Sequence, residues 1–250
     1  MVTGGGRGIG RSICQTFALE GASIVIAARG KEEIELVARE IADDGGQAVA
    51  HPVDVTDKTS VDELLSATIA RFGTIDILVN CAGYYKASRF VDYSHEDWKR
   101  IIDVNLHGTF LCTQAALPYM LKKGSGKIVN IASTAAKWGS YYQSAYNASK
   151  HAILGLTRSL ALEVAAAGVN VNAVCPGFVE TDMLKDLLGQ FTHIMGMDEG
   201  QVLAAMKARV PQGRFLQPSE VAEAALYLAS PEADGITGIG LTMAGGMILI

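Results

Sequence analysis

The chain has 250 residues, of which 49% are hydrophobic, and a formal net charge of −5 at pH 7. A chain of this length and hydrophobicity can bury a large core, and we expect one domain spanning residues 1–250. The negative charge and the absence of any Lys/Arg run argue against nucleic-acid and anionic-membrane partners, which favours small-molecule partners.

Short β-branched apolar runs alternate with longer amphipathic stretches, a pattern typical of βα units around a parallel sheet. The expected strands are Ser23–Ala28, Ala48–Val53, Ile75–Val79, Lys127–Ile131, Val169–Val174 and Ile239–Met243. The expected helices are Ile9–Glu20, Lys31–Asp44, Lys58–Phe72, Glu96–Leu121, Ser144–Ala166 and Ser219–Ala229. The longest interruption of this alternation runs from Phe178 to Pro211, and we interpret it as a lid or binding loop.

A glycine-rich loop, Thr3-Gly4-Gly5-Gly6-Arg7-Gly8-Ile9-Gly10, stands directly before the first expected helix. Glycines there let the backbone approach a pyrophosphate, and the helix N-terminus offers free N–H groups and partial positive charge. The same glycines would also suit a plain turn. Because an amphipathic helix and then a hydrophobic strand follow, dinucleotide binding is favoured. The expected contacts are Gly4, Gly6, Arg7, Gly8, Ile9 and Gly10.

Tyr146 and Lys150 stand four residues apart, which places them on one face of an expected helix. Reduction of a carbonyl builds negative charge on its oxygen, so a donor must supply a proton there. Tyr146 can do this if its pKa falls from about 10 towards neutrality, and the positive charge of Lys150 favours that fall. Ser133 follows an expected strand, from where its hydroxyl would hydrogen-bond the substrate oxygen.

Each of these residues also has an ordinary interpretation. The tyrosine and lysine would form an exposed helical pair, Ser133 a helix N-cap, and Asn105 a polar helix residue. Their combination beside a dinucleotide loop favours catalysis. The five histidines are dispersed without the spacing of a metal site, so no metal centre is expected.

The whole chain resembles the short-chain dehydrogenase/reductase family. The resemblance rests on the glycine loop, Asn80-Cys81-Ala82-Gly83, the Ser133/Tyr146/Lys150 pattern and Pro176-Gly177. It implies a Rossmann-type α/β fold, a doubly wound parallel sheet in the order 3-2-1-4-5-6-7 with helices on both faces, and a homotetramer. It also implies that the dinucleotide contacts Asp54, Val55, Asn80, Ala82, Gly83, Pro176, Gly177, Val179 and Thr181. Among these residues, the resemblance assigns Asp54 to the adenine and Thr181 to the nicotinamide amide.

The resemblance further implies that Lys150 binds the nicotinamide ribose. It implies that Asn105 bends its helix and holds a water that links Lys150 to solvent. The family's first strand has several residues before Thr-Gly, whereas only Met1 and Val2 stand here. We therefore expect that either the true start lies upstream or the chain is truncated.

The residues after the second strand bear on cofactor choice. A site for NAD places a carboxylate there to accept the ribose hydroxyls, and that carboxylate repels a 2′-phosphate. This chain has Ala27-Ala28 followed by Arg29, and Arg7 in the glycine loop could join Arg29 in holding the extra phosphate. Both arginines could also be solvated surface charges. The missing acid favours NADPH over NADH.

The segments Asn172 to Thr181 and Ala208 to Glu223 look like those of aromatic polyketide ketoreductases, which are close relatives of 3-oxoacyl carrier-protein reductases. Tyr84-Tyr85-Lys86 departs from the Pro-Gly-Gly of those ketoreductases, which puts a bulky polyketide in doubt. We expect an NADPH-dependent reductase of a hydrophobic ketone, either free or carrier-bound. The alternatives are an NAD-dependent secondary-alcohol dehydrogenase of the hydroxyacid or hydroxysteroid type, and an inactive dinucleotide-binding scaffold.

The remaining sequence features concern location. Four cysteines, Cys14, Cys81, Cys112 and Cys175, are scattered singly, without the paired spacing of a zinc site or the density of a disulfide scaffold. No segment approaches the roughly 20 apolar residues of a membrane helix, and the first residues lack a signal-peptide pattern. These features predict a soluble protein of the reducing cytoplasm.

Overall fold

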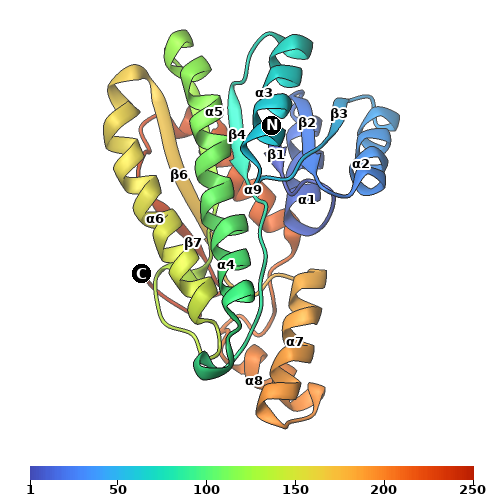
Figure 1. Cartoon of the computed structure of the whole chain (residues 1–250), viewed down its shortest axis with the longest axis vertical. Helices are drawn as coiled ribbons and strands as arrows, with labels where there is room; N and C mark the ends of the chain where they lie inside the picture. The colour runs from blue at the N-terminus through green and yellow to red at the C-terminus, as the bar shows by residue number, and fades with distance from the viewer.

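The computed structural model describes residues 1–250, which form a seven-stranded, wholly parallel sheet in the order β3-β2-β1-β4-β5-β6-β7 (Figure 1). This order confirms the predicted doubly wound topology. The strands are β1 Val2–Thr3, β2 Ser23–Ala28, β3 Gln47–Pro52, β4 Ile77–Asn80, β5 Gly126–Ile131, β6 Val169–Pro176 and β7 Gly240–Met243. Although β1 has only two residues, Val2 is in register with Ile26 on one side and Val79 on the other.

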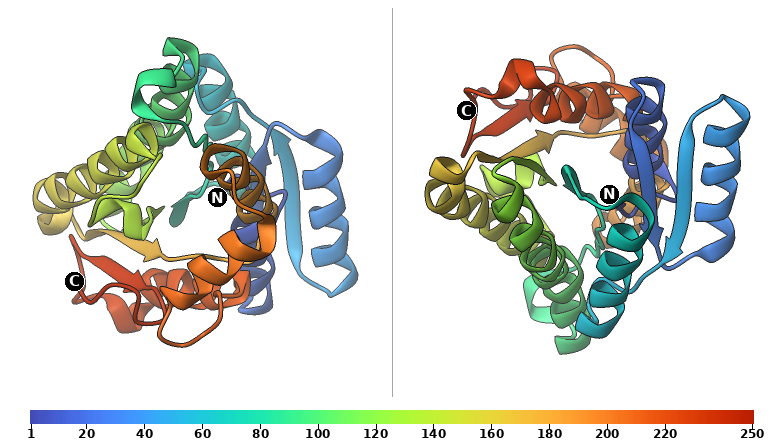
Figure 2. Two further views of the ribbon diagram at one scale, coloured as in Figure 1. Left: turned by 90° about the horizontal axis from the view of Figure 1, so that it is seen from below. Right: turned by 90° about the horizontal axis from the view of Figure 1, so that it is seen from above.

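Helices cover both faces of the sheet (Figure 2). Helices α1, α2 and α9 pack on one face, and α3, α5 and α6 pack on the other. The helices are α1 Gly8–Leu19, α2 Lys31–Asp43, α3 Lys58–Phe72, α4 His95–Ile102, α5 Gly108–Lys123, α6 Ser144–Val164, α7 Asp182–Met195, α8 Glu199–Ala208 and α9 Pro218–Ala229. None of them combines the length and apolar character that crossing a membrane requires.

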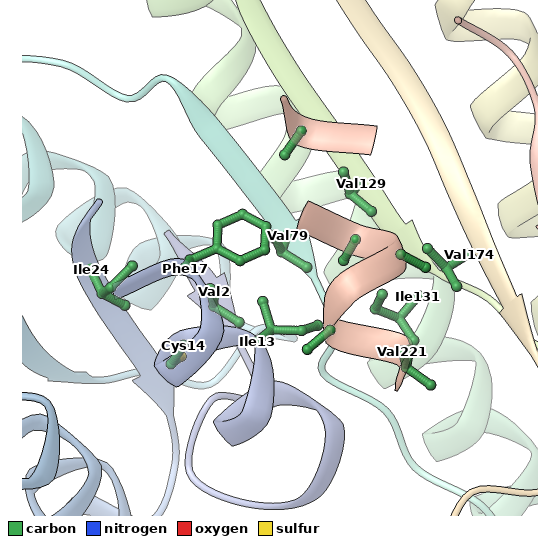
Figure 3. Close-up of a cluster of buried hydrophobic side chains, with 14 of the residues drawn as sticks. Val2, Ile13, Cys14, Phe17, Ile24, Val79, Val129, Ile131, Val174 and Val221 are labelled. Carbon is green, nitrogen blue, oxygen red and sulfur yellow. The ribbon is translucent and has the colours of Figure 1, made fainter. Parts of the chain in front are cut away.

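Side chains from the two faces of the central strands pack into two separate hydrophobic cores, because successive side chains along a strand point to opposite faces. Ile24 and Ile26 of β2 join the core under α1 and α9, which Figure 3 shows, whereas Val25 and Ala27 join the core on the opposite face. Strands buried on both sides need apolar residues at every position, which explains why β2 reads as a continuous hydrophobic run.

The expected single helix from Glu96 to Leu121 is wrong in one respect. The chain forms α4, then a π-helical turn from Asp103 to His107, and then α5. A π-helical turn adds a residue to the helix locally, a change that hydrophobic periodicity records poorly. Asn105, where the resemblance implied a bend, lies within this π-helical turn.

The insertion from Phe178 to Pro211 contains α7 and α8, which extend beyond the carboxyl ends of the strands (Figure 1). Their inward residues form a separate apolar cluster with Tyr85 and Phe215. At the base of the insertion, Glu180 N donates to Leu216 O at 2.9 Å and Leu216 N donates to Phe178 O at 2.9 Å. The insertion is thus a helical unit closed at its base.

Candidate active site

A cleft of about 1030 Å³ lies at the carboxyl ends of the strands, between the glycine loop and α7. Open α/β sheets bind their ligands at this edge, where the direction of strand succession reverses. The cleft is lined by the glycine loop, the ends of β2, β3, β4, β5 and β6, the start of α6 and the first part of α7. It therefore joins a phosphate-binding loop to the Tyr146/Lys150 pair in one continuous space.

The glycine loop is packed too closely for side chains at two positions. A Cβ on Gly10 would lie 2.1 Å from the carbonyl oxygen of Gly4, and a Cβ on Gly4 would lie 2.9 Å from the backbone nitrogen of Ala82. Helix α1 begins after Arg7, whose side chain makes no capping hydrogen bond. The first N–H groups of α1 thus remain for a ligand, and the loop fits a pyrophosphate.

The end of the cleft farther from Tyr146 is formed by the ends of β2 and β3. Arg29 follows β2, and Asp54 follows β3. Burial opposes ionisation of Asp54, but the backbone N–H and hydroxyl of Thr56 and the charge of Arg29 hold the pKa of this carboxyl below its usual value. Asp54 therefore remains an ionised acceptor near neutral pH.

The candidate catalytic groups come from β5 and α6. Ser133 follows β5 and lines the cleft beside Tyr146, and its Oγ accepts from the backbone N–H of Ala135 at 3.1 Å. Lys150 donates from Nζ to the carbonyl oxygen of Ile131 at 2.8 Å, and its Nζ lies 5.5 Å from the centre of the Tyr146 ring. These three side chains meet in the cleft, as their spacing in the sequence predicts.

The ionisation of these groups differs from the sequence-based expectation. Burial raises the pKa of Tyr146 to about 12, although the hydroxyl of Ser133 opposes this shift. Burial also lowers the pKa of Lys150 to about 8. The predicted fall of the tyrosine pKa towards neutrality is therefore not found in the protein without dinucleotide, because burial outweighs the opposing effect of the Ser133 hydroxyl. A protonated tyrosine is the form that donates during reduction.

Asn105 is fully buried in the π-helical turn and does not line the cleft. Its Nδ2 donates to Ser149 Oγ and to Tyr84 O, each at 3.0 Å, and its Oδ1 accepts from Tyr84 N at 2.7 Å. Ser149 Oγ in turn donates to Tyr146 O at 2.7 Å. Asn105 thus joins the loop that follows β4 to helix α6.

Asn80 was expected to contact the dinucleotide, but its side chain points away from the cleft. Its Nδ2 donates to Thr113 Oγ1 at 3.0 Å and to Asn130 Oδ1 at 2.9 Å. The nearby floor of the cleft is formed instead by Ala82 and Gly83. Every other expected dinucleotide contact lines the cleft, from Gly4 in the loop to Thr181 at the start of α7.

Several residues that line the cleft were not predicted from the sequence. The ring of Tyr85 lies 5.2 Å from that of Tyr146 in an edge-on arrangement, and Arg209 lies over the ring of Trp138 at 4.8 Å. Gln143 and Glu33 also line the cleft. Gln143 precedes Tyr146 by about one helical turn, so its place near the candidate catalytic tyrosine could have been predicted from the sequence. The others come together only through the tertiary fold.

The comparisons with known proteins agree with this geometry. A family model described as enoyl-(acyl carrier protein) reductase matches residues 4–248. The D-β-hydroxybutyrate dehydrogenase of Rhizobium meliloti is 41% identical, covering 98% of this chain and 96% of that protein. The 3-oxoacyl-acyl-carrier-protein reductase FabG of Thermotoga maritima is 35% identical, covering 100% of this chain and 97% of that protein.

The crystal structure of an actinorhodin polyketide ketoreductase variant with NADPH superposes with a TM-score of 0.95 and 38% identity, covering 98% of this chain and 95% of that chain. The fold, the site and these relatives define an oxidoreductase. The chain belongs to the short-chain dehydrogenase/reductase family.

The first prediction from this geometry concerns the insertion. Met183, Leu184 and Leu187 of α7 line the cleft, so closure of this helix would exclude water from the reacting groups. We expect hydrogen exchange over residues 178–211 to slow when NADPH and a substrate-like inhibitor bind. Shortening the insertion should raise KM more for large hydrophobic ketones than for small ones. Identical exchange with and without ligands would make the insertion a fixed packing element.

Proposed function

We propose that the protein reduces a ketone to a secondary alcohol with NADPH as the hydride donor and Tyr146 as the proton donor. The observation that carries this proposal is the meeting of Ser133, Tyr146 and Lys150 in the same cleft as the glycine loop. The proposed catalytic residues are Asn105, Ser133, Tyr146 and Lys150, with Asn105 acting through Ser149 and the backbone of Tyr84.

The residues of the cleft fit a dinucleotide with a 2′-phosphate. The glycine loop offers backbone N–H groups to the pyrophosphate, and Arg7 and Arg29 provide guanidinium groups for the additional phosphate. When bound, the reduced nicotinamide supplies a hydride to the carbonyl carbon. Lys150 would hold the ribose next to the nicotinamide, and Thr181 would contact the carboxamide.

Each protein group has a separate task in the proton transfer. Ser133 and Tyr146 hold the substrate oxygen by hydrogen bonds, and Tyr146 donates its proton as negative charge develops there. The charge of Lys150 stabilises the tyrosinate that remains. We assign to Asn105 the placement of a water through which Lys150 exchanges protons with solvent.

The substrate end of the cleft favours a ketone that carries a second oxygen. Its wall is apolar at Leu184 and Leu187, and the polar side chains of Tyr85 and Gln143 also line the cleft near Tyr146. The buried hydroxyl of Tyr85 has no hydrogen-bond partner, and the buried side chain of Gln143 makes no capping bond with α6. A 3-oxoacyl compound, free or carrier-bound, would satisfy them through its second carbonyl.

A second candidate function is supported by the D-β-hydroxybutyrate dehydrogenase relative. This candidate is an NAD-dependent dehydrogenase of a secondary alcohol, which would run the same chemistry in the oxidative direction. The third possibility, an inactive dinucleotide-binding scaffold, is disfavoured by the presence of all four candidate catalytic residues.

Assembly is a further part of the proposal. We propose one domain spanning residues 1–250 and a homotetramer. Large apolar side chains stay partly exposed on α5 at Phe110 and Tyr119 and on α6 at Leu162, as a subunit interface on these helices would require. Light scattering coupled to size-exclusion chromatography tests this assembly, and a purely monomeric mass would contradict it.

The test of function is cofactor oxidation against a panel of ketones. The panel contains 3-oxoacyl thioesters and esters, simple hydrophobic ketones and hydroxysteroid-type ketones, each with NADPH and with NADH. We expect turnover with NADPH and the highest kcat/KM for 3-oxoacyl compounds. A higher kcat/KM with NADH than with NADPH would support the NAD-dependent dehydrogenase, and dinucleotide binding without any turnover would support the scaffold.

A prediction for pH dependence follows from the pKa of Lys150, which burial lowers to about 8. Below that pH the lysine is charged and favours proton release from Tyr146. Above that pH the lysine is neutral and no longer stabilises the tyrosinate. We therefore expect the rate of ketone reduction to decline as pH rises through about 8. Lys150→Arg keeps a cation at all accessible pH values, so any remaining activity should decline only at higher pH. A decline at the same pH in both enzymes would assign it to another group.

A further inference from the structure

The carboxylate of Glu33 lies where the glycine loop and the start of α2 approach each other. Its Oε2 is 3.2 Å from the position that a Cβ on Gly6 would occupy and 2.8 Å from that of a Cβ on Gly30. Glu33 is in the first turn of α2, directly after Arg29 and Gly30 at the end of β2. The end of β2 has no acidic residue of its own, but the next helix, α2, places a carboxylate close to it.

The charges around Glu33 are not neutralised by one another. Glu33 lines the same cleft as Arg7 and Arg29, yet none of these three residues takes part in an ion pair. The ion pairs that involve α2 use other acids, Glu35 with Lys31 and Glu40 with Arg11. At this end the cleft therefore offers two guanidinium groups, of Arg7 and Arg29, and two carboxylates, of Glu33 and Asp54, none of them in an ion pair.

The end of the second strand is where α/β dinucleotide sites meet the 2′-position of the adenosine ribose. A 2′-phosphate carries about −1.5 to −2 charges at neutral pH, so it gains from a guanidinium and loses from a carboxylate beside it. A 2′-hydroxyl can instead donate to the carboxylate. Arg29 and Glu33 thus act in opposite senses on the same ligand position.

We propose that Glu33 is a specificity-determining residue that opposes the 2′-phosphate and accepts a hydrogen bond from the 2′-hydroxyl. The site then accepts both dinucleotides, and the preference is set by the balance between Arg29 with Arg7 and Glu33. This inference rests on the proposed function only for the orientation of the dinucleotide in the cleft. It makes the proposed preference for NADPH over NADH a moderate one.

The experiment measures ligand binding by calorimetry, without turnover. The probes are adenosine 2′,5′-bisphosphate and adenosine 5′-monophosphate, which differ only at the 2′-position, followed by NADP+ and NAD+. The variant is Glu33→Gln, which removes the charge and retains the shape. The matched control is Glu32→Gln, because Glu32 is the neighbouring acid of the same helical turn but does not line the cleft.

We expect Glu33→Gln to bind the bisphosphate and NADP+ at least about fivefold more tightly, with equal or weaker binding of the monophosphate and NAD+. Glu32→Gln should change these affinities less than about twofold. The effect of Glu33→Gln should also shrink as salt is raised, because the carboxylate acts through its charge.

Two results would overturn the inference: unchanged affinities in Glu33→Gln, or an equal change for both members of each probe pair. Its failure is separable from that of the proposed function. If the parent protein binds NAD+ more tightly but Glu33→Gln strengthens binding of the bisphosphate, the NADPH assignment fails and the role of Glu33 stands. If the parent prefers NADP+ and Glu33→Gln leaves all affinities unchanged, the NADPH assignment stands and the role of Glu33 fails.

Discussion

Tyr146→Phe is expected to lower kcat for ketone reduction by at least about two orders of magnitude while NADPH affinity stays nearly unchanged. The substitution removes the hydroxyl that donates the proton and keeps the partly buried ring that packs against Tyr85. The measurement is kcat for the best ketone of the panel, together with the Kd of NADPH from fluorescence titration. A Tyr146→Phe enzyme that retained more than a few per cent of the parent rate would remove Tyr146 from its assigned role.

Two comparisons make this result specific. Lys150→Ala should damage both turnover and dinucleotide affinity, because the lysine is assigned to the ribose as well as to the tyrosine. Tyr141→Phe is the matched control, since this tyrosine is exposed and lies outside the cleft. It should leave both quantities unchanged. Loss of activity in Tyr141→Phe would point to a general effect of tyrosine substitution on this part of the fold.

Arg29→Asp is expected to reverse the cofactor preference towards NADH. The change removes a charged donor to the 2′-phosphate and places a second carboxylate near Glu33, so NADPH should lose about ten- to a hundredfold in kcat/KM. NADH should lose little, because its ribose hydroxyls can donate to the new carboxylate. The measured quantity is the ratio of kcat/KM for the two cofactors.

Arg39→Asp provides the control for this charge reversal. Arg39 is an exposed residue of α2 that does not line the cleft, and its replacement changes the net charge by the same amount. The cofactor ratio should stay at the parent value in Arg39→Asp. An Arg29→Asp enzyme with an unchanged ratio, or a parent enzyme that already prefers NADH, would contradict the assignment of Arg29.

Much of the fold was predictable from local sequence patterns. The limits of β2 and α3 were predicted to the residue, because a continuous apolar run and a helix ending at Gly73 mark them clearly. The meeting of Ser133, Tyr146 and Lys150 was also predictable, since a helical spacing and the end of one strand determine it. These features depend on short stretches of chain and on one parallel sheet edge.

Other features depend on contacts between distant segments. The inward direction of Asn80 is determined by partners on α5 and β5, and the π-helical turn at Asn105 by its bonds to Tyr84 and Ser149. The high pKa of Tyr146 arises from burial by the assembled fold. Glu33 belongs to this group as well, because the sequence at the end of β2 contains no acid and only the path of α2 brings one there.

Gly8 of the phosphate loop lies close to Thr181 at the root of α7. A Cβ on Gly8 would lie only 3.2 Å from the Thr181 methyl group, so there is little room between the two segments. A dinucleotide that settles on the loop therefore also sets the position from which α7 closes over the substrate. We expect an ordered kinetic scheme, in which the dinucleotide enters first and leaves last, and in which the ketone competes poorly for the empty enzyme.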